Sequence, residues 1–262
     1  MGHAFSALTA FEASRGGEFL IRIEDIDVAR SKPHFEAAII EDLEWLNLTW
    51  HGPVMRQSER MACYDEALAK LVDMGLCYPC SCTRKDIETA LSAPQEGAEM
   101  GPDGIVYPGT CRNRHMDTRG PGDAVRLNIS RAVDLIRQPL NYRELGENKG
   151  DHTILPQDLV RGAGDIVLAR KDIGTCYHMA VVVDDAAQEI THITRGKDMQ
   201  SATPVHVLLQ KLLGLPTPIY RHHRLIRDRT GKRLAKRHDA LAIRVLREQG
   251  KTPEDIRAMV GL

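Results

Sequence analysis

The pattern of apolar residues predicts a helix, a turn and a strand at the start of the chain. Residues 3–14 place apolar side chains on one helical face, and the segment 17–25 is short, apolar and β-leaning. A crossover helix is predicted from about residue 33, with a proline near its start and a single buried stripe formed by Phe35, Ile39, Leu43 and Leu46.

A second long helix is predicted from about Glu59 to Met74. Ser58 is its candidate N-cap and Gly75 its candidate end. The periodicity fails from Cys77 to about residue 114, and residues 93–109 are rich in Gly and Pro, which indicates a small inserted module.

Regular patterns return in the second half of the chain. Residues 165–170, 177–185 and 190–196 read as strands, and 203–213 as a helix. Strands that alternate with helices predict an α/β sheet. The segment 219–238 then carries eight Lys or Arg residues against one acidic residue, Asp228.

Composition excludes some classes of protein. The 35 basic and 36 acidic residues nearly cancel, so any contact with RNA must be local. No apolar run reaches the roughly 18 residues of a membrane span, and the N-terminus lacks a secretory pattern, so no membrane partner and a cytoplasmic location are expected.

The cysteines suggest a metal site. Cys80, Cys82 and Cys111 fall in the irregular module, and residues two apart on an extended segment point to one side and can share a tetrahedral ion. Cys77, Tyr107 and His115 are the candidates for a fourth ligand. The alternative is a set of buried free cysteines.

Two segments suit phosphate. Gly2 and His3 begin a predicted helix, where free N–H groups attract anions, unless this start has no functional role. The segment 231–237 combines a glycine with clustered cations, as in a loop that closes over phosphates, or it is only a solvated basic face.

A charged run lies at the end of the first predicted strand. Open α/β sheets bind their ligands at strand ends, so a carboxylate within 21–27 can hold an amino group. The alternative is a set of surface ion pairs among Arg22, Glu24, Asp25 and Asp27.

Five motifs follow one another along the chain: Gly-His-Ala, RIEDID, the Cys-x-Cys module, YHMAVVVDD with ITRGKD, and GKRLAKR. In this order they resemble the glutamate-specific class I aminoacyl-tRNA synthetases over nearly the whole chain. The CSCTR and YPGTCR segments and the short C-terminal part are similar to the branch of that family that attaches glutamate to queuosine in tRNA(Asp) and has no anticodon-binding domain.

The resemblance implies residue roles. Gly2 and His3 match the end of the His-Ile-Gly-His motif, and residues 233–237 match the Lys-Met-Ser-Lys-Ser loop, with Arg233 and Lys236 on ATP and His3 and Lys236 as the catalytic pair. Ala235 replaces the serine of that loop. The remaining implied roles are glutamate binding by Glu24, Tyr177 and Arg195 and structural zinc binding by Cys80, Cys82, Tyr107 and Cys111.

The expected protein is an α/β, Rossmann-type class I synthetase catalytic core with a zinc-binding insertion and a short helical C-terminal part. The expected division is 1–76 and 116–215 for the core, 77–115 for the insertion, and 216–262 for the KMSKS-like loop and C-terminal helices. Because the family has an earlier strand and pocket segment before its first histidine, an N-terminally truncated start is also expected.

The implied activity is ATP-dependent activation of glutamate, with Mg²⁺, and its transfer to the wobble queuosine of tRNA(Asp). The chain would act as a monomer that receives the anticodon stem-loop. Two alternatives stay open: a truncated glutamyl-tRNA synthetase core that charges tRNA(Glu), and a non-catalytic remnant that binds RNA or an amino acid.

Overall fold

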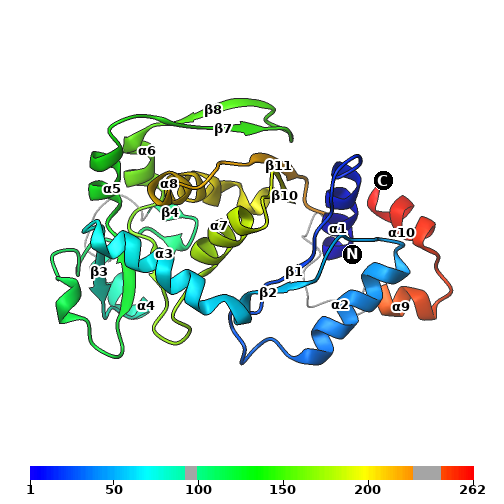
Figure 1. The fold of residues 1–262 in the computed structure, drawn as a ribbon, viewed down its shortest axis with the longest axis horizontal. Helices are drawn as coiled ribbons and strands as arrows, with labels where there is room; N and C mark the ends of the chain where they lie inside the picture. The colour runs from blue at the N-terminus through cyan, green and yellow to red at the C-terminus, as the bar shows by residue number, and fades with distance from the viewer. Residues whose placement is uncertain (92–98, 227–242) are drawn as a thin grey trace.

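The computed structural model describes residues 1–91, 99–226 and 243–262. Figure 1 shows helices and strands in alternation, with both ends of the chain on the same side of the molecule. The helices are α1 (Gly2–Ala13), α2 (Pro33–Trp45), α3 (Met61–Asp73), α4 (Arg84–Leu91), α5 (Ile129–Ile136), α6 (Pro156–Gly162), α7 (Tyr177–Ala187), α8 (Thr203–Leu213), α9 (Ile243–Glu248) and α10 (Pro253–Val260). Short 3₁₀ turns cover Gln57–Arg60, Met116–Thr118 and Lys197–Ala202. Within the described part of the chain, no helix combines the length and the apolar character that crossing a membrane requires.

The strands form several small sheets. In the largest, β10 (His192–Gly196), β11 (Ile219–His223) and β7 (Leu140–Glu144) run parallel, and β8 (Gly150–Ile154) is antiparallel to β7. The antiparallel strands β3 (Cys77–Cys80), β6 (Ala124–Leu127) and β9 (Val167–Ala169) form a second sheet. Two pairs complete the set: parallel β1 (Arg22–Ile23) and β2 (Met55–Arg56), and antiparallel β4 (Met100–Gly101) and β5 (Gly104–Ile105).

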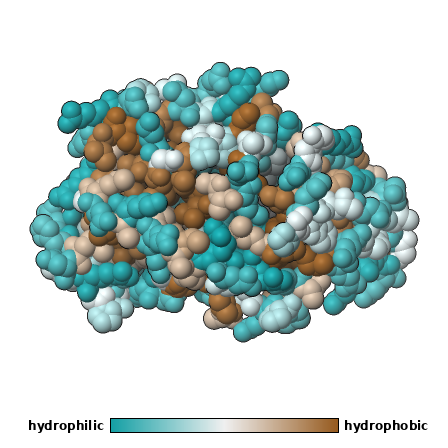
Figure 2. Space-filling model, in the orientation of Figure 1, coloured by the Kyte–Doolittle hydropathy of each residue, from teal (hydrophilic) through white to brown (hydrophobic). Residues whose placement is uncertain are grey.

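Two hydrophobic cores organise these elements. The larger joins α3, α7 and α8 to both main sheets, and the smaller joins α1 and α2 to α9 and α10. Figure 2 shows apolar residues gathered in the middle of one face, with hydrophilic residues toward the two ends. The segment after β1 crosses between the cores, because Ile21 and Ile23 pack in the smaller one and Ile26 packs against the larger.

Two local predictions are wrong. Residues 177–185 form helix α7 and not a strand. The valines favour strands when considered alone, but α7 is buried against α3, α8 and β9, and burial of the whole segment overrides that weak preference. Ser58 does not cap α3, since its hydroxyl donates to Asp25 Oδ2 at 2.6 Å and the N-cap residue is Arg60.

The predicted buried stripe on α2 is only half correct. Leu43 and Leu46 are buried, whereas Phe35 is 55% exposed and Ile39 is 46% exposed. The apolar residues of α2 that pack in the smaller core lie in its second half, from Ile40 onward, so the apolar side chains of its first turns have no place in that core. The helix from residue 203, the strand from residue 190 and the end of α3 before Gly75 are confirmed.

The buried carboxylate of Asp184 joins α7 to α3 and to the 3₁₀ turn before it. Asp184 is 0% exposed and accepts hydrogen bonds from Gln57 Nε2 at 3.0 Å, Arg60 Nε at 2.6 Å and Tyr64 Oη at 2.8 Å. Together they hold α3 and α7 in a fixed relation, and α7 carries part of the site described below.

Replacing Asp184 by alanine is expected to lower the free energy of unfolding by about 3–5 kcal/mol, because a buried ion pair would lose one member. Urea unfolding followed by circular dichroism measures this loss. Asp172→Ala is the matched control, since Asp172 pairs with Arg170 at the surface and such pairs contribute less than about 1 kcal/mol. Equal losses in the two variants would contradict the role given to Asp184.

Candidate active site

The three predicted glutamate-binding residues come together from distant parts of the sequence. Glu24 follows β1, Tyr177 is the first residue of α7, and Arg195 lies on β10. Burial raises the pKa of Tyr177; the positive charge of Arg195 opposes this effect, and the negative charge of Glu24 adds to it. These side chains therefore share one electrostatic environment.

Acidic groups outnumber basic groups around Glu24. Arg22 donates from Nη1 to Asp185 Oδ1 at 2.7 Å, and its Nη2 lies 3.7 Å from Glu24 Oε1. The Glu24 side chain is half-exposed. Its pKa is raised by partial desolvation, the Arg22 guanidinium opposes that shift, and the Asp185 and Asp184 carboxylates add to it. A ligand with an ammonium group would relieve this excess of negative charge. The alternative of surface ion pairs within residues 21–27 is therefore partly correct. Arg22 lies near Glu24, but its closer partner is Asp185 on α7.

The guanidinium of Arg195 is held by three acceptors. Its Nε donates to His222 Nε2 at 3.1 Å, its Nη1 to His206 Nδ1 at 2.9 Å and its Nη2 to Thr203 Oγ1 at 2.8 Å. An arginine has five N–H donors, so these contacts leave one N–H on each terminal nitrogen. Such a pair of donors can bind the two oxygens of a carboxylate.

The donors of Arg195 fix the proton positions on both histidines. Because a guanidinium cannot accept, the ring nitrogens that face it must carry lone pairs. The other nitrogen of His222, Nδ1, then donates to Glu144 Oε2 at 2.6 Å. Glu144 also accepts from the backbone N–H groups of His222 and Gly146. A Cβ at Gly146 would lie 2.3 Å from the His222 carbonyl oxygen, so this contact requires glycine.

Both histidines next to Arg195 are neutral. Burial lowers the pKa of His206 far below its usual value, and the charge of Arg195 adds to that effect. Burial and Arg195 also lower the pKa of His222, although Glu144 opposes them. Burial alone would raise the pKa of Glu144, but the hydrogen bonds from the backbone and ring of His222 lower it. Sequence patterns did not single out Glu144, His206 or His222, because no motif marks a buried network.

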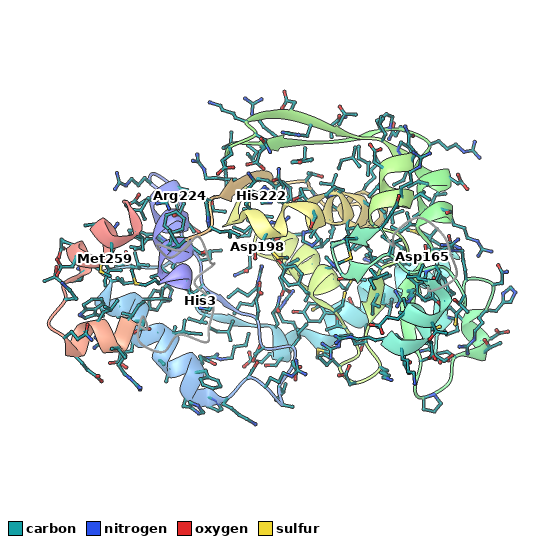
Figure 3. All side chains as sticks on the ribbon, turned by 180° about the vertical axis from the view of Figure 1, so that it is seen from behind. His3, Asp165, Asp198, His222, Arg224 and Met259 are labelled. Carbon is teal, nitrogen blue, oxygen red and sulfur yellow. The ribbon has the colours of Figure 1, made fainter. Side chains whose placement is uncertain are left out.

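The structure describes two of the four predicted ATP-binding residues. Gly2 is the first residue of α1, and His3 is exposed on the same helix, which packs beside β10. In Figure 3, His3 and His222 fall in the same half of the molecule, whereas Asp165 lies near the opposite end. Arg233 and Lys236 lie outside the described residues. The pairing of His3 with Lys236 therefore stays a prediction.

The four predicted metal ligands form one cluster. The Sγ atoms of Cys80, Cys82 and Cys111 all lie within 4.8 Å of one another. The Tyr107 hydroxyl is 3.4 Å from both Cys80 Sγ and Cys82 Sγ, and Cys82 Sγ is 3.6 Å from Cys111 Sγ. Sulfurs bound to one tetrahedral zinc at about 2.3 Å are separated by similar distances. The donor set fits zinc.

Other groups hold this cluster in place. The guanidinium carbon of Arg126 lies 3.9 Å from the centre of the Tyr107 ring. Arg112, next to Cys111, donates to the buried Asp165 at 2.6 Å. Cys77 packs in the larger core and is not part of the cluster, and burial raises the pKa of its thiol to about 12.

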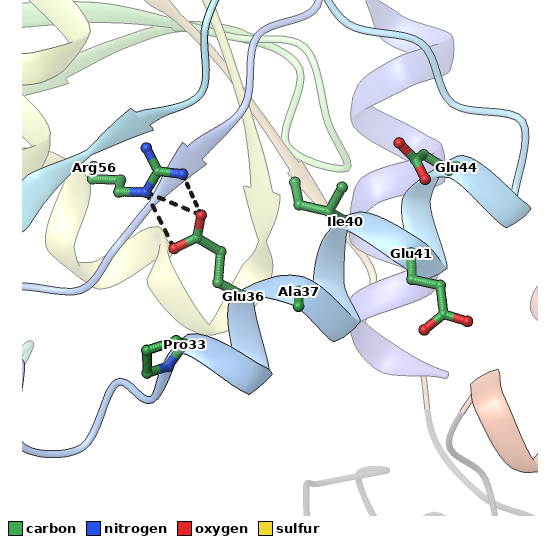
Figure 4. A pocket seen from close by; sticks show the side chains of 7 residues that line it. All are labelled: Pro33, Glu36, Ala37, Ile40, Glu41, Glu44 and Arg56. Atoms are coloured by element: carbon green, nitrogen blue, oxygen red, sulfur yellow. Dashed lines mark hydrogen bonds and ion pairs between the residues drawn. The ribbon is translucent and has the colours of Figure 1, made fainter.

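A surface hollow beside α2 is a separate feature. Figure 4 shows its wall, where Arg56 donates to Glu36 at 2.5–3.2 Å. None of the seven residues in the wall is a predicted site residue; they are Pro33, Glu36, Ala37, Ile40, Glu41, Glu44 and Arg56.

Comparisons with known proteins show the family of this chain. Residues 1–262 match the family described as tRNA synthetases class I (E and Q), catalytic domain. A Glutamyl-Q tRNA(Asp) synthetase from Rhodobacter capsulatus is 53% identical over 268 residues, which cover 100% of this chain and 95% of that protein. One from Symbiobacterium thermophilum is 39% identical, with 98% of this chain and 80% of that protein covered.

Solved structures give the same fold. The crystal structure of a glutamate-tRNA synthetase from Elizabethkingia anophelis aligns with a TM-score of 0.69 and 25% identity, covering 92% of this chain and 51% of that one. The chain thus spans about half the length of that synthetase. Fold and site together define the catalytic domain of a class I tRNA synthetase for glutamate or glutamine. Within that class, the chain belongs to the glutamyl-Q tRNA(Asp) synthetase family.

The neutral histidines predict that stability falls in mild acid. Since their pKa values are lowered on folding, the unfolded chain binds more protons below about pH 6.5, and stability is lost there by up to about 1.4 kcal/mol per pH unit for each histidine. Urea unfolding at about pH 7.5 and about pH 5.5 tests this. His206→Gln removes one titrating ring and is expected to reduce the pH dependence; an unchanged dependence would refute the assignment.

Proposed function

We propose that this chain activates glutamate with ATP and transfers it to the queuosine at the wobble position of tRNA(Asp). The observation that carries the proposal is the convergence of Glu24, Tyr177 and Arg195, with an acidic side for an ammonium group and a guanidinium for a carboxylate. The names of the two relatives described above support the same reaction.

In the proposed pocket, Glu24 binds the α-amino group of glutamate and Arg195 binds its side-chain carboxylate, with Tyr177 between them. Arg195 is fixed in orientation by three acceptors, so its two remaining donors are preorganised for a carboxylate. Glutamine would leave the positive charge without a negative partner. The site should therefore select glutamate.

Activation requires no protein nucleophile. A glutamate α-carboxylate oxygen attacks the α-phosphorus of ATP in line, the bond to the leaving pyrophosphate breaks, and glutamyl-adenylate forms. A queuosine hydroxyl then attacks the glutamyl carbonyl and releases AMP. We assign Gly2, His3, Arg233 and Lys236 to the phosphates, where positioning and charge stabilisation supply the catalysis. Mg²⁺ would add to this stabilisation.

The zinc site has a structural role in this proposal. Cys80, Cys82, Tyr107 and Cys111 would occupy all four positions of a tetrahedral ion, which leaves none for substrate. Cys80, Tyr107 and Cys111 form a minor core with Tyr78, and Cys82 packs against it. Zinc would hold together a module with few apolar residues.

The RNA partner is the anticodon stem-loop of tRNA(Asp). Arg221 and Arg224 of the basic C-terminal segment are described, and the remaining cations of that segment lie outside the described residues. Local cations of this kind can bind RNA phosphates without a positive charge on the whole chain. We further propose that the chain acts in the cytoplasm as a monomer.

Labelled glutamate, ATP and queuosine-containing tRNA(Asp) test the proposed transfer. Labelling is expected to persist when the 3′-terminal adenosine of the tRNA is removed, because the acceptor is the wobble base. An unmodified tRNA(Asp) transcript should remain at background. Labelling of tRNA(Glu), lost with its terminal adenosine, would instead identify a glutamyl-tRNA synthetase core, and absence of any adenylate would indicate a non-catalytic protein.

Cys82→Ser is expected to lower bound zinc from about one equivalent to a small fraction, because a hydroxyl is a poor replacement for a thiolate ligand. Elemental analysis of the purified variant measures the metal. Cys63→Ser is the matched control, since Cys63 lies on α3 away from the cluster. Unchanged zinc in Cys82→Ser would disprove the ligand assignment.

A further inference from the structure

A row of hydrogen bonds runs from Arg195 through His206 and a third histidine, His178, to the irregular module. His206 Nε2 lies 2.9 Å from His178 Nδ1, and His178 Nε2 lies 3.0 Å from Asp103 Oδ1. His206 is 1% exposed and His178 is 4% exposed, so water does not separate them. Asp103 lies in the turn between β4 and β5, within the residues that the sequence assigned to the insertion.

The direction of every hydrogen bond in this row is determined. Arg195 donates to His206 Nδ1, so the proton of His206 is on Nε2 and is donated to His178 Nδ1. His178 must then carry its own proton on Nε2, which it donates to Asp103. A carboxylate is a suitable end for the row because it only accepts.

The position of Asp103 depends on the packing of the module. Gly101 lies so close to the end of α6 that a Cβ would be 2.9 Å from the Gly162 carbonyl oxygen. On the other side of the turn, a Cβ added at Gly164 would lie only 2.5 Å from Val106 Cγ1, so Val106 already fills that space. Tyr107, the proposed zinc ligand, follows directly. The turn is therefore held between the core and the cysteine cluster.

We propose that Asp103 is a positioning residue for Arg195, acting through His178 and His206, so that glutamate affinity depends on the docking of the cysteine module. This inference rests on the proposed role of Arg195 in binding glutamate. Without the acceptor at Asp103, the single ring proton of His178 is no longer held on Nε2. His206 then loses its fixed partner, and the guanidinium is no longer held in one orientation.

Isothermal titration of the full chain with glutamate tests the inference. Asp103→Ala is expected to raise the Kd for glutamate by about three- to tenfold, because the hydrogen bond from His178 to a charged acceptor is lost at a half-exposed site. The Kd for ATP should not change. Asp103→Asn keeps an oxygen acceptor and is expected to restore most of the affinity.

Asp151→Ala is the matched control. Asp151 also lies in a β-hairpin and is paired with Arg143, but both side chains are exposed and neither touches the histidines. Its Kd for glutamate should equal that of the wild type.

A double-mutant cycle separates positioning from general stability. His178→Phe fills the same space and interrupts the row, so Asp103→Ala should cause no further loss of affinity in that background. Independent, additive losses would overturn the inference. So would an Asp103→Ala variant with a lower melting temperature and an unchanged Kd. If the wild type does not bind glutamate, the proposed function fails as well.

Discussion

The site depends on one constraint: a guanidinium donates five hydrogen bonds and accepts none. Every group placed against Arg195 must therefore present a lone pair, which makes His206 and His222 neutral and fixes their tautomers. Two rows of hydrogen bonds begin at the guanidinium, and they end at the carboxylates of Glu144 and Asp103. A partly buried positive charge is thus balanced at a distance by acids on two separate hairpins, and its hydrogen-bond acceptors stay uncharged.

This arrangement leaves the binding side of Arg195 open while its other side is satisfied. A carboxylate placed directly against Arg195 by the protein would compete with a ligand carboxylate. Neutral acceptors fix the orientation of the group and do not compete for its charge. The opposite charge balance occurs near Glu24, where Asp185 and Glu24 share Arg22. The two ends of the proposed glutamate pocket therefore differ in sign, as an amino acid with a side-chain carboxylate requires.

The sequence predicted α3, which has one apolar face, and also α8, and it predicted the cysteine cluster from spacing. It did not predict α7, whose valines favour a strand but are buried on all sides as a helix. Family motifs named Glu24, Tyr177 and Arg195. They did not reveal His206, His222 or Glu144, because a buried polar network depends on contacts between residues up to 78 positions apart.

The relation between the two cores explains why the pocket lies where it does. Ile21 and Ile23 are fixed in the smaller core and Ile26 in the larger one, so Glu24 stands on the short segment that crosses between them. Arg22 ties that segment to α7 through Asp185, and the neighbouring Asp184 ties α7 to α3. Any movement of one core against the other would change the distance from Glu24 to Arg195. The paired acids of α7 limit that movement, so the spacing between the two charged ends of the pocket follows from how the cores are joined.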